Sequence, residues 1–228
     1  MAITTIPWGD GSGDNIYLSA PSQTGDQSVS VTSDPNTGAA RSKVVTLSAV
    51  GVTPVSLTIN QAGVPQQYTL ELNPSSYIPK AEDGEWYGLS NASNAYNPAD
   101  NTTYAMIRLT RGSAEATTHI YFCFDTSSIP ANATINSVEC KVKVFINNAT
   151  SSNVATKQVQ MFSGTTPMGS SQNATTSASV KTFSGVTWTR EQLNDVRIRL
   201  YGVRGTNNVN SDYYFRLYGA TLTIKYQI

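Results

Sequence analysis

Charged residues are scarce in this sequence, at 13% of the chain, against roughly 25% in an average soluble domain. The 15 basic residues balance 15 acidic ones, so the formal net charge is zero. A protein that holds nucleic acid by displacing counterions from phosphates needs a basic surface, and this chain has no excess charge with which to build one. The sequence also lacks any apolar run near the ~20 residues of a membrane helix, so we do not expect it to span a bilayer.

Histidine occurs once, as His119, and cysteine twice, as Cys123 and Cys140. A Ser-His-Asp or Cys-His catalytic device would depend on that single imidazole, and no nucleophile motif accompanies it. A zinc site needs several His or Cys ligands, and the chain has too few of them. We therefore expect no enzyme and no cofactor, and we expect His119 to be a strand-end residue bonded to backbone or water.

The two cysteines lie in apolar runs that both have the pattern of strands. We expect buried reduced thiols, because free cysteine packs as a small hydrophobic residue. A disulfide between neighbouring strands is the alternative. The first eight residues show neither the basic start nor the apolar core of a secretory signal, which favours folding in a reducing cytosol.

Short uncharged polar residues and aromatic rings are abundant instead. There are 26 Ser, 28 Thr and 18 Asn, about a third of the chain, together with 12 Tyr, 6 Phe and 3 Trp. Hydrophobic residues make up 39%, which is enough for a packed core and excludes a disordered tail.

Apolar and polar residues alternate over short runs, which predicts an all-β protein. The first third contains predicted strands at 15–20, 27–33, 42–49 and 55–60. The rest contains predicted strands at 68–72, 104–110, 117–124, 135–146, 157–162, 179–183, 196–203 and 213–226. One helical turn is predicted over 189–193, where Thr189 can cap the turn and Gln192 stands three residues later.

In two of these runs the alternation assigns each residue to a face. The even positions from Val138 to Ile146 are all apolar, and the polar residues between them are expected on the solvent-exposed face of the sheet. In the run 196–203, Arg197, Arg199 and Tyr201 alternate with apolar residues in the same way.

The alternation stops at 61–67, where Gly and Pro intervene. We therefore predict an Ig-like antiparallel sandwich over 1–63, a linker at 64–67 and a jelly-roll-like sandwich over 68–228. Two polar stretches in the second domain, 147–153 and 163–178, are predicted to be loops long enough to carry recognition.

Several aromatic residues fall near predicted loops or strand ends, where an exposed ring could stack on a sugar. The candidates for glycan contact are Trp86, Tyr87, Tyr96, Tyr213 and Tyr214, with Trp8 in a similar position. Core packing is the alternative for all of them, and it is what we expect of Trp188.

Two acidic clusters are candidate sites. Asp10 and Asp14, in Asp-Gly-Ser-Gly-Asp, are weak candidates for a cation site, and a tight Asx-type turn is favoured. Glu82 and Glu85 could form the carboxylate pair of a glycoside hydrolase, but so short a spacing around a glycine is more typical of a solvated loop.

Three stretches of the first domain resemble the BACON-like immunoglobulin-type domain of Bacteroidetes and their phages. They are Ile6–Leu18, the turn Ser33–Ser42 with Asn-Thr-Gly-Ala-Ala-Arg-Ser, and Leu57–Gly63, which ends in Asn-Gln-Ala-Gly. In the second domain, Phe124–Val138 and Thr187–Asn194 look like parts of jelly-roll modules in phage structural proteins.

The resemblance implies a virion component of a crAss-like or related Bacteroides phage, made in the host cytoplasm and displayed on the virion surface. It implies a non-enzymatic head fibre or capsid decoration, assembled as a homo-oligomer on other virion proteins, with weak contact to host glycans. We expect the first domain to dock on the shell. The alternatives are a tail-associated receptor-binding adhesin and, less favoured, a glycan-active enzyme.

Overall fold

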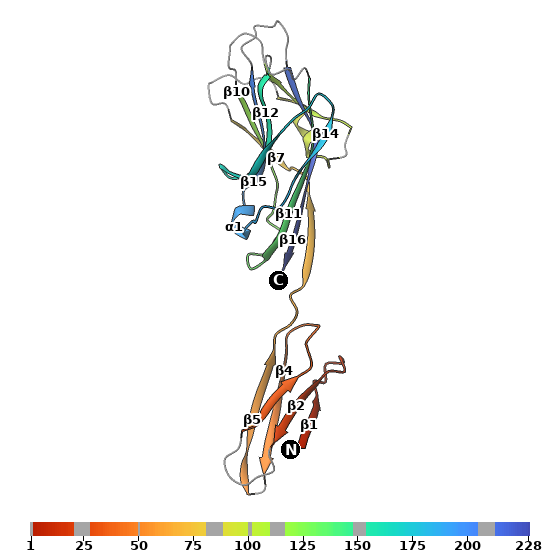
Figure 1. Cartoon of the computed structure of the whole chain (residues 1–228), viewed down its shortest axis with the longest axis vertical. Helices are drawn as coiled ribbons and strands as arrows, with labels where there is room; N and C mark the ends of the chain where they lie inside the picture. Colours follow the sequence, from red (N-terminus) through yellow and green to blue (C-terminus); the bar gives the residue numbers. More distant parts are fainter. Residues whose placement is uncertain are drawn as a thin grey trace. The chain divides into compact units, whose positions relative to one another are not determined.

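The computed structural model of the protein describes residues 2–20, 28–49, 51–80, 89–99, 102–109, 117–147, 154–204 and 213–228. Contacts divide the chain into two compact units, Met1–Gln66 and Gln67–Ile228, which we call unit 1 and unit 2. Figure 1 shows both units as assemblies of strands. The expectation of an all-β fold built of sandwiches is confirmed.

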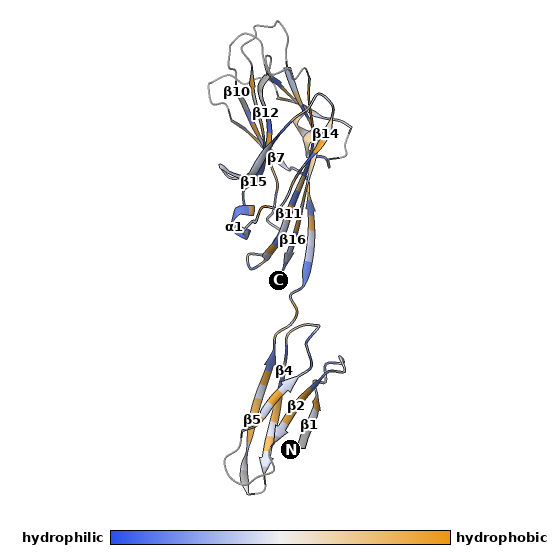
Figure 2. Ribbon diagram, in the orientation of Figure 1, coloured by the Kyte–Doolittle hydropathy of each residue, from blue (hydrophilic) through white to orange (hydrophobic). Residues whose placement is uncertain are grey.

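Unit 1 contains two antiparallel sheets. One has the order β1 (Ala2–Pro7), β2 (Asn15–Ala20), β3 (Ser30–Ser33), and the other pairs β4 (Arg41–Ala49) with β5 (Val52–Gln61). Hydrophobic and hydrophilic residues alternate along β4 and β5 in Figure 2. Strand β1 was not predicted, because two adjacent threonines interrupt its alternation.

The core of unit 1 is small. Its buried residues are Trp8, Ile16, Leu18 and Val45, and they come from both sheets. Val31, on the edge strand β3, is 37% exposed and adds little to this core. At about 25 cal/mol for each Å² of buried apolar surface, so few side chains stabilise a sandwich only weakly. Polar contacts between the sheets therefore matter to this unit.

Eight strands of unit 2 pair like a long hairpin folded over itself. The first pairs with the last, the second with the seventh, and so on inward: β6 (Gln67–Leu72) with β16 (Tyr213–Gln227), β10 (Thr117–Cys123) with β15 (Val196–Arg204), β11 (Thr134–Ile146) with β14 (Ser179–Phe183), and β12 (Val154–Ser163) with β13 (Thr166–Asn173). Two more pairings, β16 with β11 and β15 with β12, join these four strand pairs into two sheets. The sheets are β6-β16-β11-β14 and β10-β15-β12-β13, which is a jelly-roll arrangement.

The segment between β6 and β10 adds further strands to both sheets. β7 (Ser76–Lys80) extends the second sheet next to β10. In the first sheet, β9 (Ala105–Leu109) pairs with the early part of β16, and β8 (Leu89–Ser90) pairs with β9. The 3-10 helix η1 (Ala92–Tyr96) lies between β8 and β9 in the chain.

The core of unit 2 lies between the two sheets. Val138, Cys140, Val142, Val144 and Ile146 of β11 are all buried, as the alternation predicted. The alternation predicted for the run 196–203 is also confirmed. Val196, Ile198 and Leu200 face the core, and the Arg and Tyr residues between and after them stand on the outer face of β15.

The prediction of a loop over 163–178 was wrong, because β13 (Thr166–Asn173) occupies half of this range and pairs with β12. Met168 is the buried hydrophobic residue of β13, and the strand lies at a sheet edge. An edge strand needs few apolar residues, so its composition can be the same as that of a polar loop. The other predicted loop, 147–153, lies outside the described residues except for Asn147.

The predicted helical turn is present as α1 (Arg190–Leu193). Thr189 Oγ1 accepts a hydrogen bond from the backbone N–H of Gln192, and the Gln192 side chain accepts one from the N–H of Thr189, which makes a capping box. Trp188, just before it, is 5% exposed and belongs to the core, as expected. Among the described residues no helix is long and apolar enough to cross a membrane.

Candidate functional site

The aromatic candidates for glycan contact occupy different environments. Trp86 and Tyr87 lie outside the described residues. Tyr213 is 0% exposed, because its side chain points between the two sheets, and a buried ring cannot stack on a sugar. Tyr214, the next residue, is half-buried on the outer face of β16, and Tyr96 packs against the core.

Trp8 is also buried, at 5% exposure. The guanidinium carbon of Arg41 lies 4.5 Å from the centre of its ring, a cation–π contact. The Trp8 side chain is thus part of the structure of unit 1 and is not available to a ligand.

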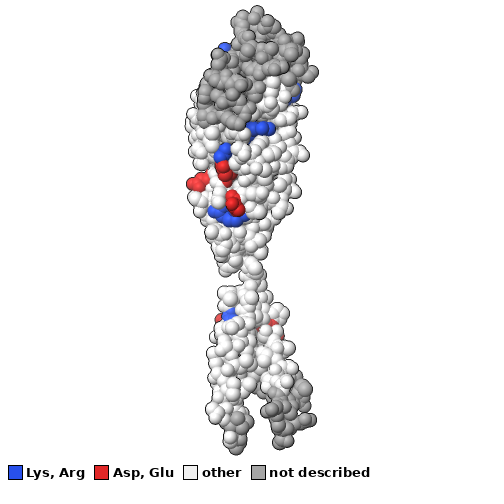
Figure 3. All heavy atoms as spheres, turned by 90° about the vertical axis from the view of Figure 1, so that its left-hand side faces the viewer, with Lys and Arg blue, Asp and Glu red and all other residues white. Residues whose placement is uncertain are grey.

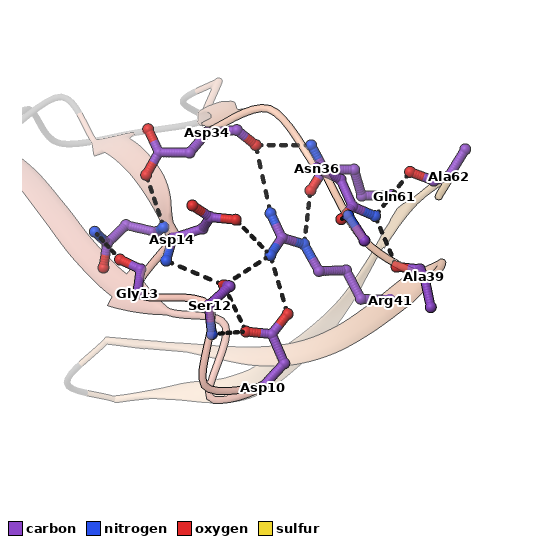
Figure 4. Close-up of polar contacts among 12 residues, drawn as sticks. Asp10, Ser12, Gly13, Asp14, Asp34, Asn36, Ala39, Arg41, Gln61 and Ala62 are labelled. Carbon is purple, nitrogen blue, oxygen red and sulfur yellow. Dashed lines mark hydrogen bonds and ion pairs between the residues drawn. The ribbon is translucent and has the colours of Figure 1, made fainter. Parts of the chain in front are cut away.

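Asp10 and Asp14 meet Arg41 (Figure 4). Arg41 Nη1 lies 3.0 Å from Asp10 Oδ2 and 2.9 Å from Asp14 Oδ2, so the two carboxylates bind a guanidinium in place of the metal cation that is the weaker prediction for this pair. Asp10 Oδ1 accepts a hydrogen bond from the N–H of Ser12 at 3.0 Å, which confirms the Asx-type turn. Within the described residues, no group of three or more His, Cys, Asp or Glu side chains is placed to hold a metal ion.

Hydrogen bonds lower the pKa of Asp10 well below its ordinary value. The largest cause is the bond from the Ser12 hydroxyl, at 2.6 Å, followed by the Ser12 backbone N–H and the Arg41 side chain. Asp10 is therefore ionised at neutral pH, which suits a permanent partner for Arg41.

Three stretches of unit 1, residues 6–18, 33–42 and 57–63, meet around Arg41. Arg41 Nε donates to Gln61 Oε1 at 2.9 Å, and Gln61 Nε2 donates to the carbonyl of Asp34 at 2.8 Å. Asn36 Nδ2 donates to the carbonyls of Ala39 and Ala62 (Figure 4). These motif residues therefore join turns and strand ends of the two sheets, which is a structural role.

His119 and the cysteines do not form a catalytic group. His119 lies on the outer face of β10, where its ring centre is 4.3 Å from that of Tyr201. Cys123 and Cys140 are free and lie in different sheets of unit 2, in β10 and β11. Burial raises the pKa of both thiols, so neither is an activated nucleophile.

The outer face of β10, β15 and β12 carries a cluster of arginine and aromatic side chains. We call it the Arg199 face, and its residues are His119, Tyr121, Gln160, Phe162, Arg197, Arg199 and Tyr201. The guanidinium of Arg199 lies 4.4 Å from the Phe162 ring centre and 5.0 Å from that of Tyr201. Tyr121 and Phe162 meet edge to face beneath the arginines, at 5.7 Å between ring centres.

The outer face of the other sheet carries a second such cluster. The guanidinium of Arg216 lies 4.6 Å from the Tyr104 ring centre and 5.0 Å from that of Phe145. The Nζ atom of Lys143 lies 5.1 Å from the ring centre of Tyr218. Both outer faces of unit 2 therefore present cations held against rings, an arrangement typical of binding surfaces.

A groove of about 530 Å³ is lined by residues of β6, β16 and β11 and by residues 184–188, which follow β14. Glu71 and Glu139 line it from the strands on either side of Thr223, and Lys141 and Lys225 also line it. Lys141 and Glu139 form an exposed ion pair at 3.3 Å. The opposite charges balance, so this groove has no preference for ligands of one sign.

Outside these clusters, charges are sparse. Figure 3 shows a face of the molecule on which Lys, Arg, Asp and Glu atoms form small patches among uncharged residues.

Neither outer cluster could be predicted from the sequence. The alternation of Arg197, Arg199 and Tyr201 shows one strand of the Arg199 face. The rings that flank it come from β10 and β12, and the register that brings them together is a property of the fold.

No protein-family model matches this chain, and no curated protein matches it. Among solved structures, a chain from the structure of infectious bursal disease virus Gt strain aligns at 8% identity with a TM-score of 0.31, covering 93% of this chain and 41% of the viral chain. A chain from the Gx strain aligns at 8% identity and a TM-score of 0.26, covering 95% and 42%. This chain thus spans about two fifths of the length of these viral chains, and at such scores the likeness transfers neither fold nor function.

Proposed function

We propose that the protein is a non-enzymatic component of a virion surface, a head fibre or capsid decoration of a Bacteroides phage, assembled as a homo-oligomer. The assignment to a phage virion is supported by the stretches of unit 1 that resemble BACON-like domains and by those of unit 2 that resemble jelly-roll modules of phage proteins. The observation that carries a binding role is the pair of arginine and aromatic clusters on the outer faces of unit 2.

Unit 1 is proposed as the docking unit, attached to other virion proteins, with unit 2 projecting to the host surface. The test is incorporation into particles of a chain that lacks residues 1–63, compared with the full-length protein. We expect the truncated chain to be absent from purified particles although its unit 2 still unfolds cooperatively. Normal incorporation of the truncated chain would overturn this assignment.

A tail-associated adhesin is the second candidate, and the same outer faces of unit 2 favour it because they suit ligand binding. Immunogold labelling of intact particles separates the two, since a decoration covers the head and an adhesin sits on the tail. Sedimentation of the purified protein tests the homo-oligomer, and a monomer at micromolar concentration would contradict it.

A further inference from the structure

We propose that the Arg199 face binds saccharides that carry a carboxylate, with Arg199 contacting the carboxylate and Tyr201 the sugar ring. This inference rests on the proposed binding role of unit 2 and names the class of ligand. It is argued from the contrast between two arginines that stand two residues apart on the same face of β15.

Arg197 already has an anionic partner. Its Nε and Nη2 donate to the two carboxylate oxygens of Asp195, at 2.6 Å and 2.5 Å, and its guanidinium lies 5.6 Å from the Tyr121 ring centre. This two-point pairing neutralises the charge and uses the donors in the geometry that guanidinium prefers.

Arg199 meets no carboxylate among the described residues. Its polar contact is a single hydrogen bond from Nη2 to Gln160 Oε1, at 3.2 Å, and its Nε is buried without an acceptor there. A half-buried cation that meets no anion among the described residues is costly in a folded protein. An anionic ligand that approaches from solvent would pair with the charge of the guanidinium but would not reach the buried Nε.

The rings on both sides hold Arg199 in place. Phe162 and Tyr201 flank its guanidinium at 4.4 Å and 5.0 Å, and the side chain stands on β15, the strand between β10 and β12. A guanidinium fixed in this way loses little conformational freedom when it binds, which is the condition for an effective anion contact.

The neighbouring ring gives the ligand its class. Tyr201 is half-buried beside Arg199, and its ring also contacts His119 at 4.3 Å. A hexuronic acid presents an apolar C–H face and a carboxylate on the same ring, so it can stack on Tyr201 while its carboxylate reaches Arg199. A neutral sugar would fill the ring contact and leave the cation without a partner.

The test is calorimetric titration of the full-length protein with tetragalacturonate and, as the matched neutral ligand, its methyl ester. We expect the acid to bind and the ester to bind at least about tenfold more weakly, as loss of a hydrogen-bonded charge implies. Arg199→Gln should weaken binding of the acid by a similar factor. Arg197→Gln removes the same charge from the same strand and should have a much smaller effect, and the melting temperature of each variant verifies its fold.

Equal losses in the two variants would overturn the proposal, because they would indicate general attraction to positive charge. Equal affinity for acid and ester, or no binding of the acid, would also overturn it. Binding of a polyglutamate peptide that depends on Arg199, without binding of the uronate, would assign the face to an acidic protein segment instead. Particle incorporation is measured separately, so this inference can fail while the proposed virion role stands.

Discussion

In unit 1, the guanidinium of Arg41, on β4, lies 4.5 Å from the centre of the Trp8 ring, which follows β1. The contact joins the two sheets at a point where the hydrophobic core is small. The same guanidinium binds the carboxylates of Asp10 and Asp14 and the side chain of Gln61. One side chain therefore links the β1–β2 connection to the ends of β4 and β5.

Arg41→Lys should lower the melting temperature of unit 1 by several degrees. Lysine keeps the positive charge but lacks the planar fork that reaches two carboxylates and an amide at once. Differential scanning calorimetry of the full-length chain measures the transition of unit 1. Val44→Ala, at a 59% exposed position of the same strand, is the matched control and should change that transition little. A variant Arg41→Lys that melts like the wild type would show that charge alone is sufficient.

The lowered pKa of Asp10 predicts how its contribution depends on pH. Because the pKa is lower in the folded protein than in the unfolded chain, the charged carboxylate stabilises unit 1 fully above about pH 4. That stabilisation is lost as the pH falls further and the carboxylate takes up a proton. Asp10→Asn should therefore destabilise unit 1 at pH 7, and the difference from wild type should shrink between pH 4 and pH 2. A difference that stays constant over this range would contradict the role of the charge.

Secondary structure could be predicted where burial on one side enforces alternation. The central strand β11 alternates along its length and was assigned correctly, as was the capping box of α1. Strand β13 was missed because it lies at a sheet edge, where few positions need to be apolar. Strand β1, also at a sheet edge, was missed because two adjacent threonines interrupt its alternation. The sequence alone could therefore suggest two sandwiches but could not supply the full pairing of the jelly roll.

The candidate sites depended even more on the fold. Asp10 and Asp14 were recognised as a pair, but their partner Arg41 lies about thirty residues away, and the contact could not be seen locally. Tyr213 and Tyr214 were equivalent in the sequence, and one is buried while the other is half-exposed. Which of two adjacent residues faces solvent depends on the register of β16, which its partners β11 and β9 determine.

Gly219→Ala should destabilise unit 2 by about 2–4 kcal/mol, in the range of substitutions that force atoms into a packed site. A Cβ at this position would lie 2.3 Å from the carbonyl oxygen of Asn97 and 2.4 Å from that of Pro98. The N–H of Ala220 donates to the same Asn97 carbonyl at 3.0 Å, so the backbone cannot move away without losing this bond. Urea denaturation measures the effect.

The control for this substitution is Gly38→Ala in unit 1. A Cβ there would have Asn36 Oδ1 as its nearest neighbour, at 3.8 Å, which is ordinary contact. Its effect should be below about 1 kcal/mol. Equal effects of the two substitutions would mean that the close approach of Asn97 is not what requires glycine at position 219.

The cysteines should behave as two thiols of unequal reactivity. Cys140 is 0% exposed and Cys123 is half-buried, and burial raises the pKa of each thiol. A thiol reagent at pH 8 should therefore modify Cys123 slowly in the native protein, whereas Cys140 should react only on unfolding, because the thiolate is the reactive form. Unfolding without reductant should release both thiols. Cys123→Ser should abolish the native reaction and Cys140→Ser should preserve it, while failure to find two thiols in the unfolded wild-type protein would indicate a disulfide and contradict the structure.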